Sequence, residues 1–225
     1  SRAFVKILHQ ANVDFAVLGT EESSTGDAAK RAGNEFLFQM QAMMNIEVLN
    51  GYEVKKIVTC DPHSFNTLKN EYPSLGGKYE VFHHTQFIQN LISEGRLKIN
   101  DSSILKGKRV TFHDPCYLGR ANDVYESPRD LIKRLGVNLT EMKRHKSTAL
   151  CCGAGGAQMF KDAEKGDKEI NVLRTEDALE TKPQIIATGC PYCNTMMTDG
   201  IKFKEKEAEV VVKDIAELIA EANNL

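Results

Sequence analysis

The sequence predicts an α/β protein made of two tandem, pseudo-symmetric copies of a small Rossmann-like unit with a parallel sheet. Short apolar segments alternate with amphipathic ones along the chain, a pattern typical of parallel sheets flanked by helices. Several anchors also recur at a steady offset. Thr59 to Ser64 matches Thr188 to Cys193, and Tyr79 to Val81 matches Ala208 to Val210, each 129 positions later. Recurrence at a fixed spacing indicates two copies of one unit.

The first predicted unit covers residues 1–104. Phe36, Met40, Met43 and Met44 have helical spacing, and Asp61-Pro62 is a typical helix start. The expected elements are the end of a helix (2–10), a strand (13–18), a helix (28–50), a strand (56–59), a helix (61–72), a strand (79–83) and a helix (87–94).

The second predicted unit covers residues 105–225, after a polar boundary at 98–107. Asp114-Pro115 ends its first strand, and Cys190-Pro191 begins a helix. The expected elements are strands at 109–113, 139–142, 184–188 and 209–212, and helices at 128–135, over most of 158–179, from 190 and at 214–222.

The totals exclude several classes of protein. The net charge is −2 with no basic stripe, which argues against a nucleic-acid partner. No apolar run approaches the roughly 18 residues that span a bilayer, and no signal peptide is visible. We expect a cytoplasmic protein, or one associated with a membrane through a preceding segment or a partner. The chain begins inside a helix without Met, so we expect a fragment whose first unit is truncated at its N-terminus.

Five of the six cysteines lie in the second half, and each follows an expected strand. The five are Cys116, Cys151, Cys152, Cys190 and Cys193. Carboxyl ends of parallel strands share one edge, so the five sulfurs can converge there. A helix start at Cys190 stabilises thiolates, and Gly153, Gly155 and Gly156 can bring backbone N–H groups to the same cofactor.

Five thiolates exceed the four of a tetrahedral zinc site and the four of an ordinary cubane. A larger or unusual iron–sulfur cluster is therefore the hypothesis that fits five thiolates better than zinc or an ordinary cubane. The alternatives are a zinc-bound assembly module, a metal-free dithiol relay, and inert core thiols or disulfides. Cys60, alone in the first half, is interpreted as a buried thiol.

Three segments carry a family resemblance: His113-Asp114-Pro115-Cys116, Cys151-Cys152-Gly153-Ala154-Gly155-Gly156 and Cys190-Pro191-Tyr192-Cys193. Together they resemble the cysteine-rich CCG domain of heterodisulfide reductase-like iron–sulfur oxidoreductases, whose members carry two copies in tandem. The resemblance implies an electron-transfer domain or subunit of an oxidoreductase. It also implies that the five cysteines bind a non-cubane [4Fe-4S] cluster, with zinc as the alternative metal.

The resemblance implies partners too. These are a ferredoxin-like iron–sulfur segment or subunit as electron source, and a flavoprotein, a disulfide or a membrane quinone/haem module as acceptor. The first copy departs from the pattern, because Ser24, Thr25, Asp61 and Ser64 stand where the second copy has cysteines. One cluster is therefore expected rather than two. His63 and His113 are the candidate proton donors.

Overall fold

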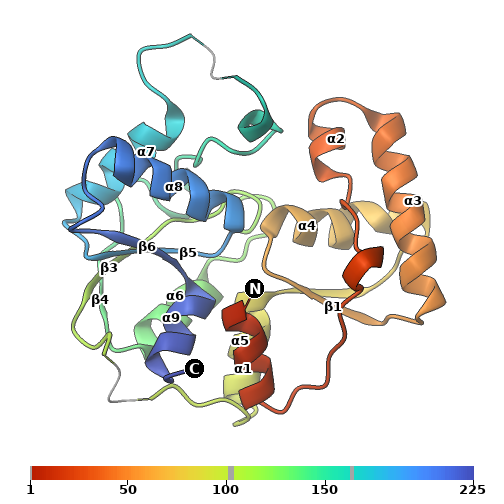
Figure 1. Ribbon diagram of the computed structural model, residues 1–225, viewed down its shortest axis with the longest axis horizontal. Helices are drawn as coiled ribbons and strands as arrows, with labels where there is room; N and C mark the ends of the chain where they lie inside the picture. Colours follow the sequence, from red (N-terminus) through yellow and green to blue (C-terminus); the bar gives the residue numbers. More distant parts are fainter. Residues whose placement is uncertain (1, 101–103, 163–164) are drawn as a thin grey trace.

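The structure, a computed structural model, describes residues 2–100, 104–162 and 165–225 and contains two parallel sheets (Figure 1). In the first sheet, β1 (Lys56–Thr59) pairs with β2 (Glu80–His83). The second sheet has the order β4-β3-β5-β6, and every neighbouring pair is parallel. Its strands are β3 (Arg109–Phe112), β4 (Asn138–Leu139), β5 (Ile185–Thr188) and β6 (Val211–Asp214). The α/β class with parallel sheets is confirmed.

Helices connect the strands in the alternation that the sequence predicts. Those before β3 are α1 (Arg2–Gln10), α2 (Asp27–Arg31), α3 (Glu35–Gly51), α4 (Pro62–Asn66) and α5 (His84–Ser93). A π-helical turn (Thr67–Glu71) and a 3-10 turn (Tyr72–Leu75) extend α4. Those after β3 are α6 (Glu126–Arg134), α7 (Ile170–Glu180), α8 (Pro191–Phe203) and α9 (Ile215–Ala222).

The four-stranded sheet is covered on both faces. Side chains of a strand alternate between faces, and β5 shows it: Ile185 and Ala187 join one apolar cluster, whereas Ile186 joins another. The first cluster includes residues of α6 and α9, and the second includes residues of α7 and α8. Figure 1 shows α7 and α8 on one side of this sheet and α6 and α9 on the other.

The largest apolar cluster joins the two halves of the chain. It holds Phe4 and Ile7 of α1 and Ile88 of α5 together with Ile215 and Leu218 of α9. Polar contacts cross the same boundary. The His83 ring donates through Nε2 to the Gly189 carbonyl at 2.9 Å, and His84 Nε2 lies 3.1 Å from Asp214 Oδ1. The histidine pair therefore links the two halves of the chain and has a structural role.

The strand predicted at residues 13–18 is wrong. The segment has no ladder partner in the described chain, and the carbonyls of Ala11 and Asn12 instead accept from the Arg96 guanidinium. Val13 and Phe15 still pack on the large cluster, whereas Val17 is exposed. The apolar pattern of this segment reflects the packing of its side chains. A strand also needs a neighbouring strand to hydrogen-bond with its backbone groups, and this segment has none in the described chain.

The helix predicted over most of 158–179 begins late. A 3-10 turn at Gln158–Phe160 precedes turns and bends, and α7 starts only at Ile170. Residues 163 and 164 of this prediction, and 101–103 of the predicted boundary, lie outside the described residues. The stretch before Ile170 offers few apolar side chains to bury, so no packing supports a helix there. Within the described chain, no helix is long and apolar enough to cross a bilayer.

Candidate metal centre

The structure brings together the five cysteines of the second half at the carboxyl edge of the four-stranded sheet. Cys116 lies just beyond β3, and Cys190 and Cys193 lie at the start of α8 beyond β5. Cys151 and Cys152 lie on the loop of residues 150–156, called the glycine loop below. Their thiols interact in an unbroken series, Cys116 with Cys151, Cys151 with Cys152, Cys152 with Cys193 and Cys193 with Cys190. The Sγ atoms of Cys193 and Cys152 are 3.4 Å apart. All are free thiols.

Backbone N–H groups donate to these sulfurs within the glycine loop and at the N-terminus of α8. Gly153 has φ +95°, a left-handed conformation that L side chains rarely adopt, and its N–H donates to Cys151 Sγ at 3.3 Å. The Ala154 N–H donates to Cys152. Cys190 is the N-cap of α8, and its Sγ accepts from the Cys193 N–H at 3.5 Å. Such donors favour thiolate over thiol.

The proton affinities differ strongly within this group. Hydrogen bonds from Cys116 and Cys152, with the Gly153 N–H, hold the pKa of Cys151 far below its ordinary value against the effect of burial. Its thiolate neighbour and burial raise the pKa of Cys152 to about 12, and those of Cys116 and Cys193 also rise. Protons shared among adjacent sulfurs in this way are what a bound metal replaces.

His113 lies against the same sulfurs. One of its ring nitrogens, Cys152 Sγ and Cys193 Sγ all lie within 4.8 Å of one another. Nδ1 accepts a hydrogen bond from Arg174 Nε at 3.0 Å. Burial, with the nearby Arg174 charge, lowers the pKa of His113 to about 3, so the ring is neutral at physiological pH.

Two buried arginines hold the segments around the cysteines, and sequence reasoning missed both. The Arg129 guanidinium binds both Asp114 oxygens at 2.7 and 2.8 Å and both Glu141 oxygens at 2.7 and 2.9 Å. Arg174 binds His113, the Arg144 carbonyl and Asp177. Basic residues on amphipathic helices are usually solvated, so nothing in the pattern marked these two as buried.

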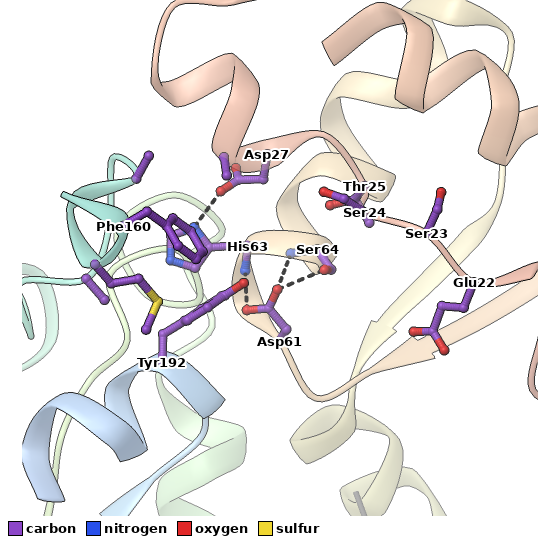
Figure 2. A pocket seen from close by; sticks show the side chains of 14 residues that line it. Glu22, Ser23, Ser24, Thr25, Asp27, Asp61, His63, Ser64, Phe160 and Tyr192 are labelled. Carbon is purple, nitrogen blue, oxygen red and sulfur yellow. Dashed lines mark hydrogen bonds and ion pairs between the residues drawn. The ribbon is translucent and has the colours of Figure 1, made fainter. Parts of the chain in front are cut away.

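A pocket of about 220 Å³ separates the glycine loop from the first half of the chain (Figure 2). One side carries the positions that lack cysteine, Ser24, Thr25, Asp61 and Ser64. The other side carries Ala154, Met159 and Phe160 from the glycine loop and its extension, and Tyr192 from the Cys190–Cys193 segment. The pocket therefore abuts the cysteine centre.

His63 belongs to the first half but lies between two cysteine-bearing segments of the second. Its ring centroid is 4.3 Å from that of Tyr117 and 5.5 Å from that of Tyr192, and each tyrosine is adjacent to a site cysteine. Nδ1 lies 2.8 Å from Asp27 Oδ2 (Figure 2). Hydrogen bonds from His63 and Arg31 outweigh burial and lower the pKa of Asp27, so this carboxylate is ionised.

The remaining candidate residues are placed as follows. Cys60 lies outside the sulfur group and packs on the large apolar cluster, where burial raises its pKa to about 12. Gly155 approaches His63, since a Cβ added there would lie 3.7 Å from His63 Cε1. Gly156 has φ +69° and continues the loop. Asp61 caps α4 by accepting from the N–H groups of His63 and Ser64.

The fold and the site together define a parallel α/β protein with five free thiols gathered at one edge of its sheet. Residues 110–198 match the family described as "Cysteine-rich domain", CCG. The matched residues include all five clustered cysteines, which confirms the resemblance to the CCG domain, and the relatives of the chain include an iron–sulfur-binding oxidoreductase and heterodisulfide reductase subunits.

Three relatives illustrate the similarity. The chain is 48% identical over 221 residues to "Probable iron-sulfur-binding oxidoreductase FadF" of Bacillus subtilis, covering 98% of this chain and 31% of that protein. It is 43% identical over 226 residues to "EtfAB:quinone oxidoreductase" of Syntrophomonas wolfei, with the same coverages. It is 35% identical over 231 residues to one of the subunits of the dihydromethanophenazine:CoB–CoM heterodisulfide reductase of Methanosarcina barkeri, covering 98% of this chain and 54% of that protein. The chain thus spans about a third to a half of the length of these relatives.

Proposed function

We propose that Cys116, Cys151, Cys152, Cys190 and Cys193 bind one [4Fe-4S] cluster of non-cubane type, through which the protein relays electrons. The observation that carries the proposal is a set of five contiguous sulfurs, with backbone N–H groups donating to them. The sulfurs outnumber the four ligands of a tetrahedral zinc site or an ordinary cubane. When bound, the cluster supplies reversible one-electron chemistry. Gly153, Gly155 and Gly156 form the loop that lines it.

The first unit, residues 1–104, is proposed to be a copy of the second, residues 105–225, without its sulfur ligands. Asp61 caps α4 as Cys190 caps α8, and both helices follow a parallel strand. Gly26 and Gly153 both have positive φ. With Ser24, Thr25, Asp61 and Ser64 in place of cysteines, the first unit holds no cluster and forms one side of the pocket.

The partners follow from the same proposal and from the relatives' names. Electrons reach the cluster from a ferredoxin-like iron–sulfur segment or subunit. They leave to a disulfide, a flavoprotein or a quinone-linked partner, and one relative is named as an EtfAB:quinone oxidoreductase. Membrane association, where it occurs, comes through a preceding segment or a partner.

His63 is proposed as the proton donor of the pocket, rather than His113. It lines the pocket, and the ionised Asp27 fixes its orientation through Nδ1. His113 is fully buried and does not line the pocket. Quinones and disulfides take up protons with electrons, so a proton donor beside the cluster would accelerate the reaction with either acceptor.

The experiment is metal and sulfide analysis with EPR on anaerobically purified protein. Iron with acid-labile sulfide is expected, and Cys151→Ser is expected to lose most of both because a serine oxygen is a poor substitute for a thiolate. The matched control, Cys60→Ser, removes a cysteine outside the sulfur group and is expected to retain the iron content.

Two outcomes would replace the proposal. Stoichiometric zinc without iron indicates the structural assembly module. Active protein without metal, with a reversible two-electron thiol couple, indicates the dithiol relay.

A further inference from the structure

The ring of His113 has a defined tautomer. It is fully buried, and Nδ1 lies 3.0 Å from Nε of Arg174, whose side chain is also fully buried. An arginine guanidinium carries only donors and does not deprotonate in proteins. Nδ1 must therefore be the acceptor, which places the single proton of the neutral ring on Nε2.

That Nε2–H group lacks an acceptor within the described part of the chain, where His113 Nε2 is buried without a hydrogen bond. A buried donor without an acceptor destabilises the folded state, so its retention points to an acceptor that binds there. One nitrogen of the ring, Cys152 Sγ and Cys193 Sγ all lie within 4.8 Å of one another, so an acceptor bound beside the ring would lie at the candidate metal centre.

The same geometry excludes His113 as a ligand, although it groups with Cys152 and Cys193. Coordination through Nε2 requires a lone pair on that atom and thus a proton on Nδ1. The Nδ1–H and the Arg174 Nε–H would then be two donors directed at each other. Arg174 is held in place by the Arg144 carbonyl at 2.7 Å and by Asp177 at 3.3 Å.

We propose that His113 donates an Nε2–H hydrogen bond to a sulfur of the cluster and raises its midpoint potential, with Arg174 fixing the tautomer. The proposal rests on the iron–sulfur centre proposed above. Hydrogen bonds to cluster sulfurs stabilise the added negative charge of the reduced state, and they are one of the factors that set cluster potentials.

The first test compares three anaerobic proteins by EPR-monitored redox titration. His113→Leu removes the donor and is expected to shift the midpoint potential to more negative values with iron and sulfide retained. His113→Gln keeps an N–H donor and is expected to lie closer to the unsubstituted protein. Equal potentials in all three would overturn the proposal.

The second test does not depend on any variant folding. In ¹⁵N-histidine-labelled protein, ENDOR spectra of the paramagnetic cluster are expected to show weak nitrogen coupling and a proton that exchanges in D₂O. Strong coupling from a directly bound nitrogen would overturn the proposal. Protein without iron and sulfide would contradict the proposed iron–sulfur function. A cluster with a nitrogen ligand would contradict only the role assigned to His113.

Discussion

At the scale of the residue, the site combines groups from both halves of the chain. The sulfurs all come from the second half, but His63 and Asp27 come from the first. Tyr117 and Tyr192 contact the His63 ring and connect it to the segments of Cys116 and Cys193. This separates electron transfer, assigned to the sulfurs, from proton transfer, assigned to the histidine–carboxylate pair.

His63→Gln is expected to slow reoxidation of the reduced protein by a water-soluble quinone by about 10²-fold, the scale of general acid catalysis. Reoxidation by ferricyanide is expected to be unchanged, because that acceptor takes an electron without a proton. Stopped-flow absorbance of the cluster measures both rates.

The ferricyanide rate separates a proton donor from a structural residue. An equal loss with both acceptors contradicts the assignment, because it indicates a damaged centre. His9→Gln, on α1 outside the pocket, is the matched control and is expected to alter neither rate.

At the scale of the element, the close packing of α7 on α8 positions both sides of the centre. α8 carries Cys190 at its N-cap and Cys193 in its first turn, and α7 carries Arg174 against His113. The contact depends on Gly200. A Cβ there would lie 2.0 Å from Thr175 Oγ1 and 3.1 Å from the Asn171 carbonyl oxygen, so the two helices meet only because position 200 lacks a side chain.

Gly200→Ala is therefore expected to lower the free energy of unfolding by about 1–3 kcal/mol, the usual cost of overpacking. Chemical denaturation measures it. Gly51→Ala is the matched control: it lies at the end of α3, and a Cβ would meet nothing within 4 Å among the described residues. A gain or no change is expected there, since alanine favours helix over glycine. Equal effects of the two substitutions would contradict the packing argument.

At the scale of the whole molecule, the sequence predicted the order of strands and helices better than it predicted which strands pair and which helix faces are buried. Strand alternation and the Pro-containing helix starts located β1, β5, α4 and α8, because these signals are local. Helical spacing predicted one helix over 28–50, whereas the structure divides this range into α2 and α3, with Asn34 capping α3. The exposed Phe36 and Met43 and the buried Phe38 and Ala42 show that spacing does not say which face of α3 is covered. The extended 13–18 segment was misassigned because ladder pairing is a tertiary property.

The convergence of the cysteines could be predicted from one rule, that carboxyl ends of parallel strands share an edge. The side chains that hydrogen-bond to the two site histidines could not be predicted in this way. Arg174 reaches His113 across 61 positions and Asp27 reaches His63 across 36, and no local signal encodes such pairs. The same limit applies to the two units: their recurrence is visible in the sequence, but the core that they share is not.

That shared core predicts one cooperative unfolding unit. Ile88 of α5 is fully buried in the cluster that also contains Ile215 and Leu218 of α9. Ile88→Ala is expected to lower the free energy of unfolding by about 2–5 kcal/mol, since it leaves a cavity in a well-packed core. Native-state hydrogen exchange is expected to show the same loss of protection for the amides of β1 and of β5, although only β1 shares the half of the chain that is changed. Val17→Ala, at a side chain that is 73% exposed in the same half, is expected to alter neither strand. Loss of protection confined to β1 would contradict this prediction, because it would show that the two units on either side of the pocket unfold independently.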